Sequence, residues 1–120
     1  MQFNKLHHVS LMVYDLEESL KFYQDILGLN TLPRPSFPVP GAWIELADGR
    51  QLHIIETDEK FAETMHHFAL KVDKLEQHIE HLEKKGVQVS EIRAIPDTTI
   101  RQCFFRDPSG NMIELNESSD

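Results

Sequence analysis

Apolar and polar residues alternate along several short segments of this chain, as expected for strands with one buried face. The alternation predicts strands over residues 6–13, 42–46, 51–56, 66–72, 99–105 and 111–116, with extended structure over 87–95. Turn sequences at 47–50 (ADGR) and 107–110 (DPSG) predict that two pairs of these strands form hairpins. Four prolines in the stretch 33–41 exclude regular structure, so a loop is predicted there.

Two segments change to the spacing of amphipathic helices. Asp15 is the expected N-cap of the first helix and Gly28 marks its expected end. Asp73 is the expected N-cap of the second helix, with Glu76 at the capping-box position and Gly86 at the end. The order of elements is therefore strand, helix, extended segments, and then the same again.

The two halves also repeat each other in sequence. Residues 7–17 (HHVSLMVYDLE) match residues 66–76 (HHFALKVDKLE) at a constant offset of 59. Near the ends of the halves, residues 47–56 resemble residues 107–117 at an offset of 61. We interpret the chain as one domain, residues 1–120, built from two duplicated modules of about 4–58 and 64–118 joined by a polar linker.

The repeat places residues of metal-binding type at equivalent positions. His8 is equivalent to His67, and His53 is equivalent to Glu114. If the sheets of the two modules face each other, these four side chains converge on one point. Imidazoles with one carboxylate suit a divalent ion such as Zn, Fe, Ni, Co or Mn. Taken singly, each could be a hydrogen-bonded core histidine or a solvated charge, but their joint occurrence favours a metal site, with His53 as ligand or as a base beside it.

Other reactive side chains are predicted to have no part in this site. Strand alternation turns His7 and His66 to the opposite face. His78 and His81 lie one turn apart in a strongly polar helix segment and are interpreted as a solvated face. The single cysteine, Cys103, lies in an apolar strand pattern, which indicates a buried, inert thiol.

The net charge and composition argue against some classes of binding partner. The net charge is −8, and no basic stripe is present, which argues against nucleic acid and anionic membrane surfaces. No apolar run approaches the length of a membrane span, and the first residues lack the apolar segment of a signal peptide. The expected location is the cytoplasm.

The motifs LHHVSLMVYDLEESLKFYQDILGL, HHFALKV and DPSGNMIEL, in this order, resemble the vicinal oxygen chelate superfamily. This superfamily includes glyoxalase I, bleomycin-resistance proteins, fosfomycin-resistance thiol transferases, methylmalonyl-CoA epimerase and extradiol dioxygenases. The resemblance covers nearly the whole chain and implies an α+β fold, in which two βαβββ modules form a half-barrel cleft. It also implies a small-molecule substrate and a homodimer with each cleft built from both subunits.

The resemblance further implies one divalent metal held by residues matching His8, His67 and Glu114. His53 falls where glyoxalase I and the epimerase carry another ligand. The implied chemistry is chelation of two neighbouring substrate oxygens. Our first hypothesis is a glyoxalase-like lyase or isomerase with Glu114 as the base and His53 as the second candidate. The alternatives are an Fe(II)-dependent dioxygenase and a non-catalytic small-molecule binding or resistance protein.

Strand parity predicts four substrate-binding residues around the metal: Ser10, Trp43, Gln102 and Phe104. Trp43 is expected to stack on a planar ligand, with a core position for Trp43 and Phe104 as the alternative. Parity turns Arg101 away from the metal. Two further arginines are candidates for an anionic group at the rim, namely Arg34 and Arg50.

The sequence departs from glutathione-dependent glyoxalase I at two positions. Met12 and Thr57 stand where that enzyme has an arginine and an asparagine, so a glutathione adduct is not the expected substrate.

Overall fold

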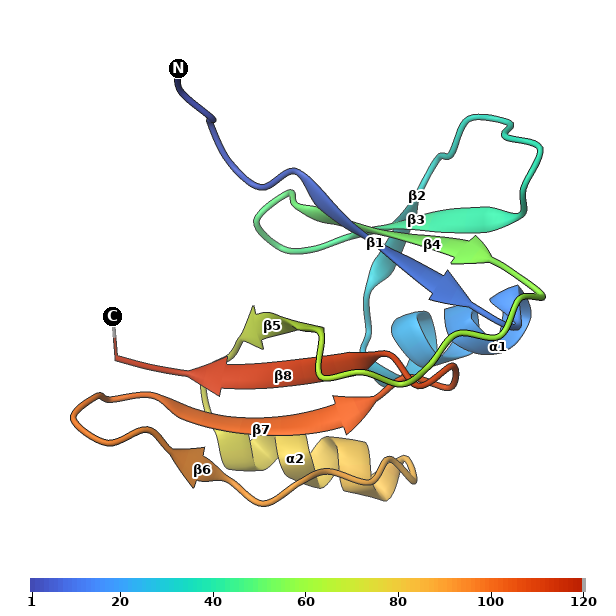
Figure 1. Cartoon of the computed structure of the whole chain (residues 1–120). Coiled ribbons are helices and arrows are strands. Elements are labelled where there is room, and N and C mark those ends of the chain that lie inside the picture. The colour runs from blue at the N-terminus through green and yellow to red at the C-terminus, as the bar shows by residue number, and fades with distance from the viewer. Residues whose placement is uncertain (120) are drawn as a thin grey trace. The chain divides into compact units, whose positions relative to one another are not determined.

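The computed structural model describes residues 1–119, which form two compact units: residues 1–61 are unit 1, and unit 2 begins at Ala62. Unit 1 contains β1 (His8–Val13), α1 (Leu16–Leu20), η1 (Lys21–Ile26), β2 (Asn30–Leu32), β3 (Gly41–Glu45) and β4 (Gln51–Glu56). Unit 2 contains β5 (His67–Lys71), α2 (Leu75–Lys84), β6 (Arg93–Ala94), β7 (Arg101–Arg106) and β8 (Met112–Glu117) (Figure 1).

Each unit has one four-stranded sheet, and the two sheets have the same topology. The strand orders are β1-β4-β3-β2 in unit 1 and β5-β8-β7-β6 in unit 2. The first strand of each unit pairs in parallel with the last, and the other pairs are antiparallel. Two mixed sheets with few helices confirm the predicted α+β fold, and both predicted hairpins, β3–β4 and β7–β8, are present.

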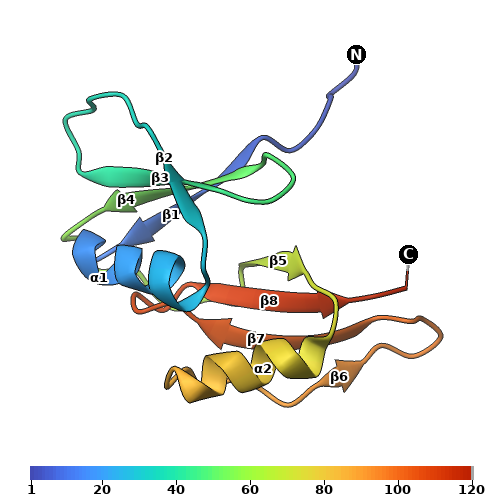
Figure 2. The ribbon, with the colours of Figure 1, turned by 180° about the vertical axis from the view of Figure 1, so that it is seen from behind.

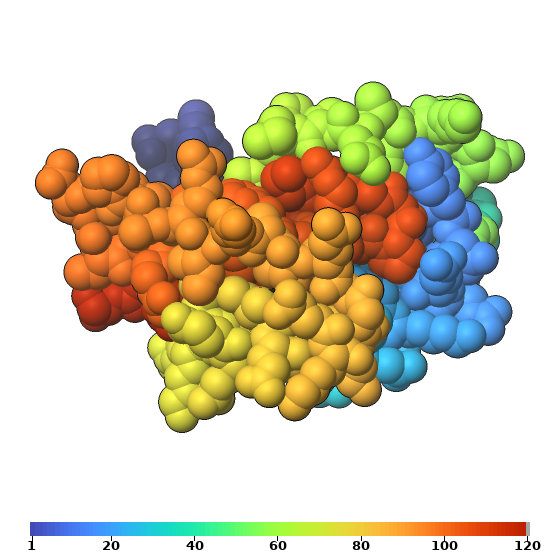
Figure 3. Space-filling model, turned by 90° about the horizontal axis from the view of Figure 1, so that it is seen from below, coloured from blue at the N-terminus to red at the C-terminus, as the bar shows by residue number. Residues whose placement is uncertain are grey.

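One helical segment covers one face of each sheet, and the cores lie beneath these segments. In unit 2, α2 lies along the sheet (Figure 2), and its surface adjoins that of the segment that follows it (Figure 3). The buried apolar side chains of unit 1 are Val13, Phe22, Tyr23, Ile44, Leu52 and Ile54. Those of unit 2 are Leu75, Leu82, Cys103, Phe105, Ile113 and Leu115. Within residues 1–119, no helix has the length and apolar character needed to cross a bilayer.

The capping prediction was right for the first helix and wrong for the second. Asp15 accepts a hydrogen bond from the Glu18 amide at 2.9 Å, as predicted. Asp73 does not cap α2, because the N-cap is Lys74, which has a left-handed φ of 56° and makes no side-chain cap bond. The first helical amide, that of Leu75, instead donates to Oε2 of Glu117 at 2.8 Å. A carboxylate from the last strand of the unit thus replaces the local cap.

Unit 1 contains the equivalent bond, which the sequence repeat did not reveal. The amide of Leu16 donates to Oε2 of Glu56, on β4, at 2.9 Å. Glu56 and Glu117 are the repeat-related residues at the offset of 61. In both units, therefore, the start of the helix is joined to the final strand.

Three other elements differ from expectation. The second half of the first predicted helix is the π-helix η1, in which the amide of Leu27 donates to the carbonyl of Phe22 at 3.0 Å. Strand β2 was not predicted, because three residues are too few for alternation to be recognised. Of the extended segment over 87–95, only the two residues of β6 pair as a strand.

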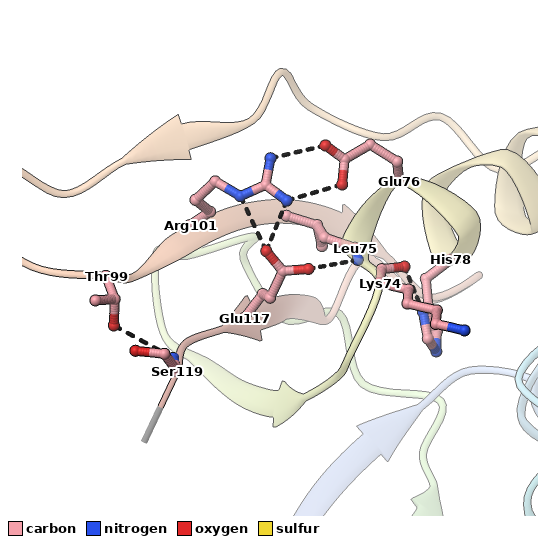
Figure 4. Close-up of polar contacts among 8 residues, drawn as sticks. All are labelled: Lys74, Leu75, Glu76, His78, Thr99, Arg101, Glu117 and Ser119. Carbon is pink, nitrogen blue, oxygen red and sulfur yellow. Dashed lines mark hydrogen bonds and ion pairs between the residues drawn. The ribbon is translucent and has the colours of Figure 1, made fainter.

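Arg101 connects α2 to the sheet from the helix side, as parity predicted (Figure 4). Its guanidinium donates to both carboxylate oxygens of Glu76 at 2.7 and 2.8 Å, and to Oε1 of Glu117 at 2.9 and 2.6 Å. Hydrogen bonding from Arg101 lowers the pKa of Glu76 to about 2. The pKa of Glu117 is also lowered, first by the Leu75 amide and then by Arg101.

These shifts predict how stability depends on pH. Because both carboxyls have a lower pKa in the folded state than in the unfolded state, their contribution is fully present above about pH 4.5 and is lost as the pH falls toward 2. We expect Arg101→Met to flatten the acid limb of a plot of Tm against pH. Arg93→Met removes the same charge from unit 2 without removing an ion pair, and it should leave the wild-type slope. Equal slopes for wild type and Arg101→Met would contradict the prediction.

Candidate metal site

In unit 1, three aromatic rings stack on one face of the sheet. His8 and His53 lie on the parallel neighbours β1 and β4, and their rings are 3.9 Å apart and 14° from parallel. Trp43 is the cross-strand partner of His53, and its ring lies 4.5 Å from His53 at 8°. The rings of His8, His53 and Trp43 therefore form a column, and Trp43 is half-buried beside the predicted ligand His53 rather than in the core.

His53 is a neutral imidazole at neutral pH. Its pKa is lowered, first by burial and then by electrostatic interaction with His8, His7 and Arg34. Its Nε2 lies 2.8 Å from Oε1 of Gln51, which accepts, so Nε2 carries the hydrogen and Nδ1 keeps its lone pair. A neutral ring with a free lone pair is suited to bind a metal or to accept a proton.

His7 does not turn away from the site as predicted. Its Nδ1 lies 2.9 Å from Nδ1 of His8, and the two rings meet edge to face at 5.2 Å. The prediction was wrong because β1 begins at His8, so strand alternation does not extend to His7. The contact engages Nδ1 of His8 and leaves Nε2 as its atom for a further partner.

In unit 2, the predicted site residues His67 and Glu114 lie together. His67 begins β5, Glu114 lies on the parallel neighbour β8, and Nε2 of His67 is 3.1 Å from Oε1 of Glu114. Glu114 is buried, at 6% exposure, and its other oxygen accepts a hydrogen bond from Asn116 at 2.9 Å. The ring of Phe104 meets that of His67 edge to face at 5.3 Å. The structure thus places a buried carboxylate directly against an imidazole nitrogen.

The hydrogen-bond partners of the His67 ring show that this pair fits a cation. Its Nδ1 lies 2.9 Å from the carbonyl oxygen of Met65, and because a carbonyl only accepts, Nδ1 carries the hydrogen. In the neutral ring, Nε2 then presents a lone pair to the Glu114 carboxylate, so two acceptors face each other. A proton or a metal ion satisfies both. Donation of the remote ring N–H to a carbonyl is the arrangement that orients metal-binding histidines.

Each unit brings together two of the four predicted ligands. They form two pairs, His8 with His53 in unit 1 and His67 with Glu114 in unit 2. Among residues 1–119, no group of three or more His, Cys, Asp or Glu side chains could hold a metal ion. The convergence of both pairs on one ion stays a prediction.

The remaining predicted residues lie around these pairs. Ser10 is exposed on β1 and is the cross-strand partner of His53. Gln102 is half-buried on β7, opposite Asn116. Two residues that the sequence analysis did not predict are Gln51 and Asn116, which are hydrogen-bonded to His53 and Glu114. Each lies two residues from its partner on the same strand and so on the same face, which strand alternation could have predicted.

Two residues set aside by sequence reasoning behave as predicted. Cys103 is fully buried, and burial raises the pKa of its thiol to about 11. His78 is exposed on α2, with Nδ1 3.1 Å from the carbonyl oxygen of Lys74.

Comparison with known proteins identifies a matching family and several similar proteins. The family model of the "Glyoxalase/Bleomycin resistance protein/Dioxygenase superfamily" matches residues 5–115. The uncharacterized protein YaeR of Escherichia coli is 31% identical, over 94% of this chain and 95% of that protein. A lactoylglutathione lyase of Haemophilus influenzae is 30% identical, over 92% of this chain and 90% of its own length.

A similar fold occurs in the fosfomycin resistance protein FosX from Listeria monocytogenes. The crystal structure of a FosX mutant, complexed with Mn(II) and 1S,2S-dihydroxypropylphosphonic acid, covers 98% of this chain and 95% of its own. The TM-score is 0.85 at 21% sequence identity.

Proposed function

Because this chain belongs to the Glyoxalase/Bleomycin resistance protein/Dioxygenase superfamily, we propose that it is a divalent-metal-dependent lyase or isomerase of the glyoxalase type. Its substrate is a small molecule with two neighbouring oxygen atoms. The observation that carries the proposal is the pair of facing acceptors, Nε2 of His67 and Oε1 of Glu114.

We propose four ligands for one ion: His8, His53, His67 and Glu114. The set is completed either within one chain or between the two subunits of a homodimer. Three imidazoles and a carboxylate suit Zn, Ni, Co, Mn or Fe. When bound, such an ion supplies positive charge that polarises two neighbouring substrate oxygens and offsets the negative charge that develops there.

The chain's own residues supply the proton transfer. Glu114 is the first candidate for the base that moves a proton α to a carbonyl, because Asn116 orients one of its oxygens and leaves the other facing His67. His53 is the second candidate, as an alternative to its role as a ligand, because its lowered pKa leaves Nδ1 unprotonated at neutral pH and able to accept a proton. The rings of Trp43 and Phe104 border the two pairs, and with Ser10 and Gln102 they would contact the substrate.

The relatives support this reaction class without fixing the substrate. One is a lactoylglutathione lyase, and the FosX complex holds Mn(II) together with a molecule that carries two neighbouring hydroxyl groups. Met12 and Thr57 disfavour a glutathione adduct for this chain, so we propose a substrate without glutathione.

A dioxygenase is the second candidate function. Two histidines and one carboxylate, here His8, His67 and Glu114, are the set typical of non-haem Fe(II) oxygenases. Activity with Fe(II) alone, accompanied by oxygen uptake, would distinguish it from an isomerase that also works with redox-inert ions. A protein without bound metal and without turnover would support non-catalytic small-molecule binding.

The proposal is tested by metal analysis of the purified protein. We expect about one divalent ion per set of four ligands in the wild type, and loss of most of it in His67→Ala, because the ion loses one of its ligands. His78→Ala is the matched control, since His78 is an exposed helix residue outside both pairs. Equal metal content in wild type and His67→Ala would refute the assigned site.

A further inference from the structure

Arg34 lies in the proline-rich loop between β2 and β3 and is held in place by its surroundings. Its Nη2 donates to the carbonyl of Val39 at 2.9 Å, and its guanidinium carbon lies 4.8 Å from the centre of the Phe37 ring. Prolines at 33, 35, 38 and 40 restrict the backbone of the loop. The guanidinium is therefore positioned before any ligand binds, and only part of it is buried.

Arg34 lies beside the start of β3 and close to Trp43. A Cβ at Gly41 would clash with the backbone oxygen of Ile54, and it would lie 3.0 Å from Nη2 of Arg34 and 3.1 Å from its Cζ. The Phe37 ring that contacts Arg34 lies 6.3 Å from the Trp43 ring, and Trp43 stacks on His53. The guanidinium is therefore connected to the Trp43–His53 stack through Phe37.

The charge of Arg34 is not neutralised by an acid in the part of the chain that the structure describes. Within residues 1–119, no Asp or Glu pairs with Arg34, in contrast to Arg50, which pairs with Asp48, and Arg101, which pairs with Glu76 and Glu117. Several of its N–H donors are therefore free for a ligand.

From this placement we propose that Arg34 binds a carboxylate of the substrate and so determines specificity at the site of the proposed function. A planar carboxylate matches the fork of a guanidinium. Gly41 lies two residues from Trp43, about 7 Å along the strand. The substrate is then a small organic anion: its neighbouring oxygens lie at the site histidines and its carboxylate at Arg34, with the Trp43 ring alongside.

Two probes of the same shape, one with a carboxylate and one with a neutral carboxamide, test this inference. 3,4-Dihydroxybenzoate and 3,4-dihydroxybenzamide both offer neighbouring oxygens, and only the first carries a carboxylate. Isothermal titration of the Zn²⁺-loaded full chain avoids redox chemistry of the probes. We expect the acid to bind about 10-fold more tightly than the amide, as one charge-assisted contact at a half-exposed site would give.

Variants then assign the difference to Arg34. We expect Arg34→Gln to lower the affinity for the acid about 10-fold and to leave the affinity for the amide unchanged. Unchanged binding of the amide also shows that the variant is folded. Arg34→Lys keeps the charge without the fork and should give an intermediate affinity for the acid. Arg50→Gln removes the same charge elsewhere in unit 1 and should change neither affinity.

The possible failures separate the two proposals. Equal affinities for acid and amide would overturn the role of Arg34, and so would equal losses of affinity for the acid in Arg34→Gln and Arg50→Gln. Neither result would contradict the proposed function. Failure of both probes to bind would overturn the role of Arg34, and the metal content of the wild type and His67→Ala would then decide the proposed function independently.

Discussion

Replacing Glu114 by glutamine is expected to weaken metal binding and, at the same time, to stabilise the metal-free fold. Glutamine keeps the size of the side chain but removes the negative charge that a divalent ion requires from a ligand. We expect the affinity for Zn²⁺ to fall by about 100-fold, a loss similar in size to the removal of strong orienting partners at metal sites. Competition with a chromophoric chelator measures this change.

The opposite effect on stability follows from the contact with His67. In the metal-free protein, when no proton is shared between them, the buried carboxylate faces the lone pair of Nε2 at 3.1 Å. The amide of a glutamine can donate to that nitrogen and still accept from Asn116, so a buried charge is replaced by a satisfied neutral group. We expect the free energy of unfolding, measured with a chelator at alkaline pH so that no proton is shared, to rise by about 1 kcal/mol.

Asn116→Asp is the contrasting change, because it places a second carboxylate against Glu114 and should destabilise the metal-free protein. Urea denaturation with and without chelator separates the two effects for each variant. A Glu114→Gln protein that binds Zn²⁺ as tightly as the wild type would remove Glu114 from the ligand set.

A second substitution with a large expected effect, here on the free energy of unfolding, is at Ile113, the residue next to Glu114. Its side chain is fully buried, on the face of β8 opposite to that of Glu114. Ile113→Ala removes buried methyl groups and leaves a cavity, which should lower the free energy of unfolding by about 2–5 kcal/mol. Ile113→Val removes a single methylene and should cost about 0.5–1.5 kcal/mol.

The two neighbouring positions should therefore separate stability from metal binding. Below its unfolding transition, Ile113→Ala should retain wild-type metal content, because the His67–Glu114 contact lies on the other face of the strand. Loss of metal from a folded Ile113→Ala protein, shown by circular dichroism, would mean that the two faces are coupled.

Much of the fold could be predicted because the relevant signals are local. Alternation in 51–56 and 111–116, with a glycine turn before each strand, specified both hairpins. The repeat marked His8, His53, His67 and Glu114 as equivalent positions on the first and last strands of each unit, but it did not predict that they form the pairs His8–His53 and His67–Glu114 within the units.

What could not be predicted depends on contacts between residues far apart in the sequence. Asp73 has the right type and place for an N-cap, but Glu117, 42 residues beyond Leu75, caps the helix instead. The position of Arg34 depends on Phe37 and Val39, in a loop that has no periodicity, and on Gly41 at the start of β3. No rule based on residue spacing contains either contact.

The carboxylates that hold the helix amides also bear on how the chain folds during synthesis. Glu56 and Leu16 are 40 residues apart, and Glu117 and Leu75 are 42 apart. Each bond lies wholly within one unit, so both partners of the unit 1 bond are present once Glu56 has left the ribosome. This order of synthesis is the one that folding unit by unit would require.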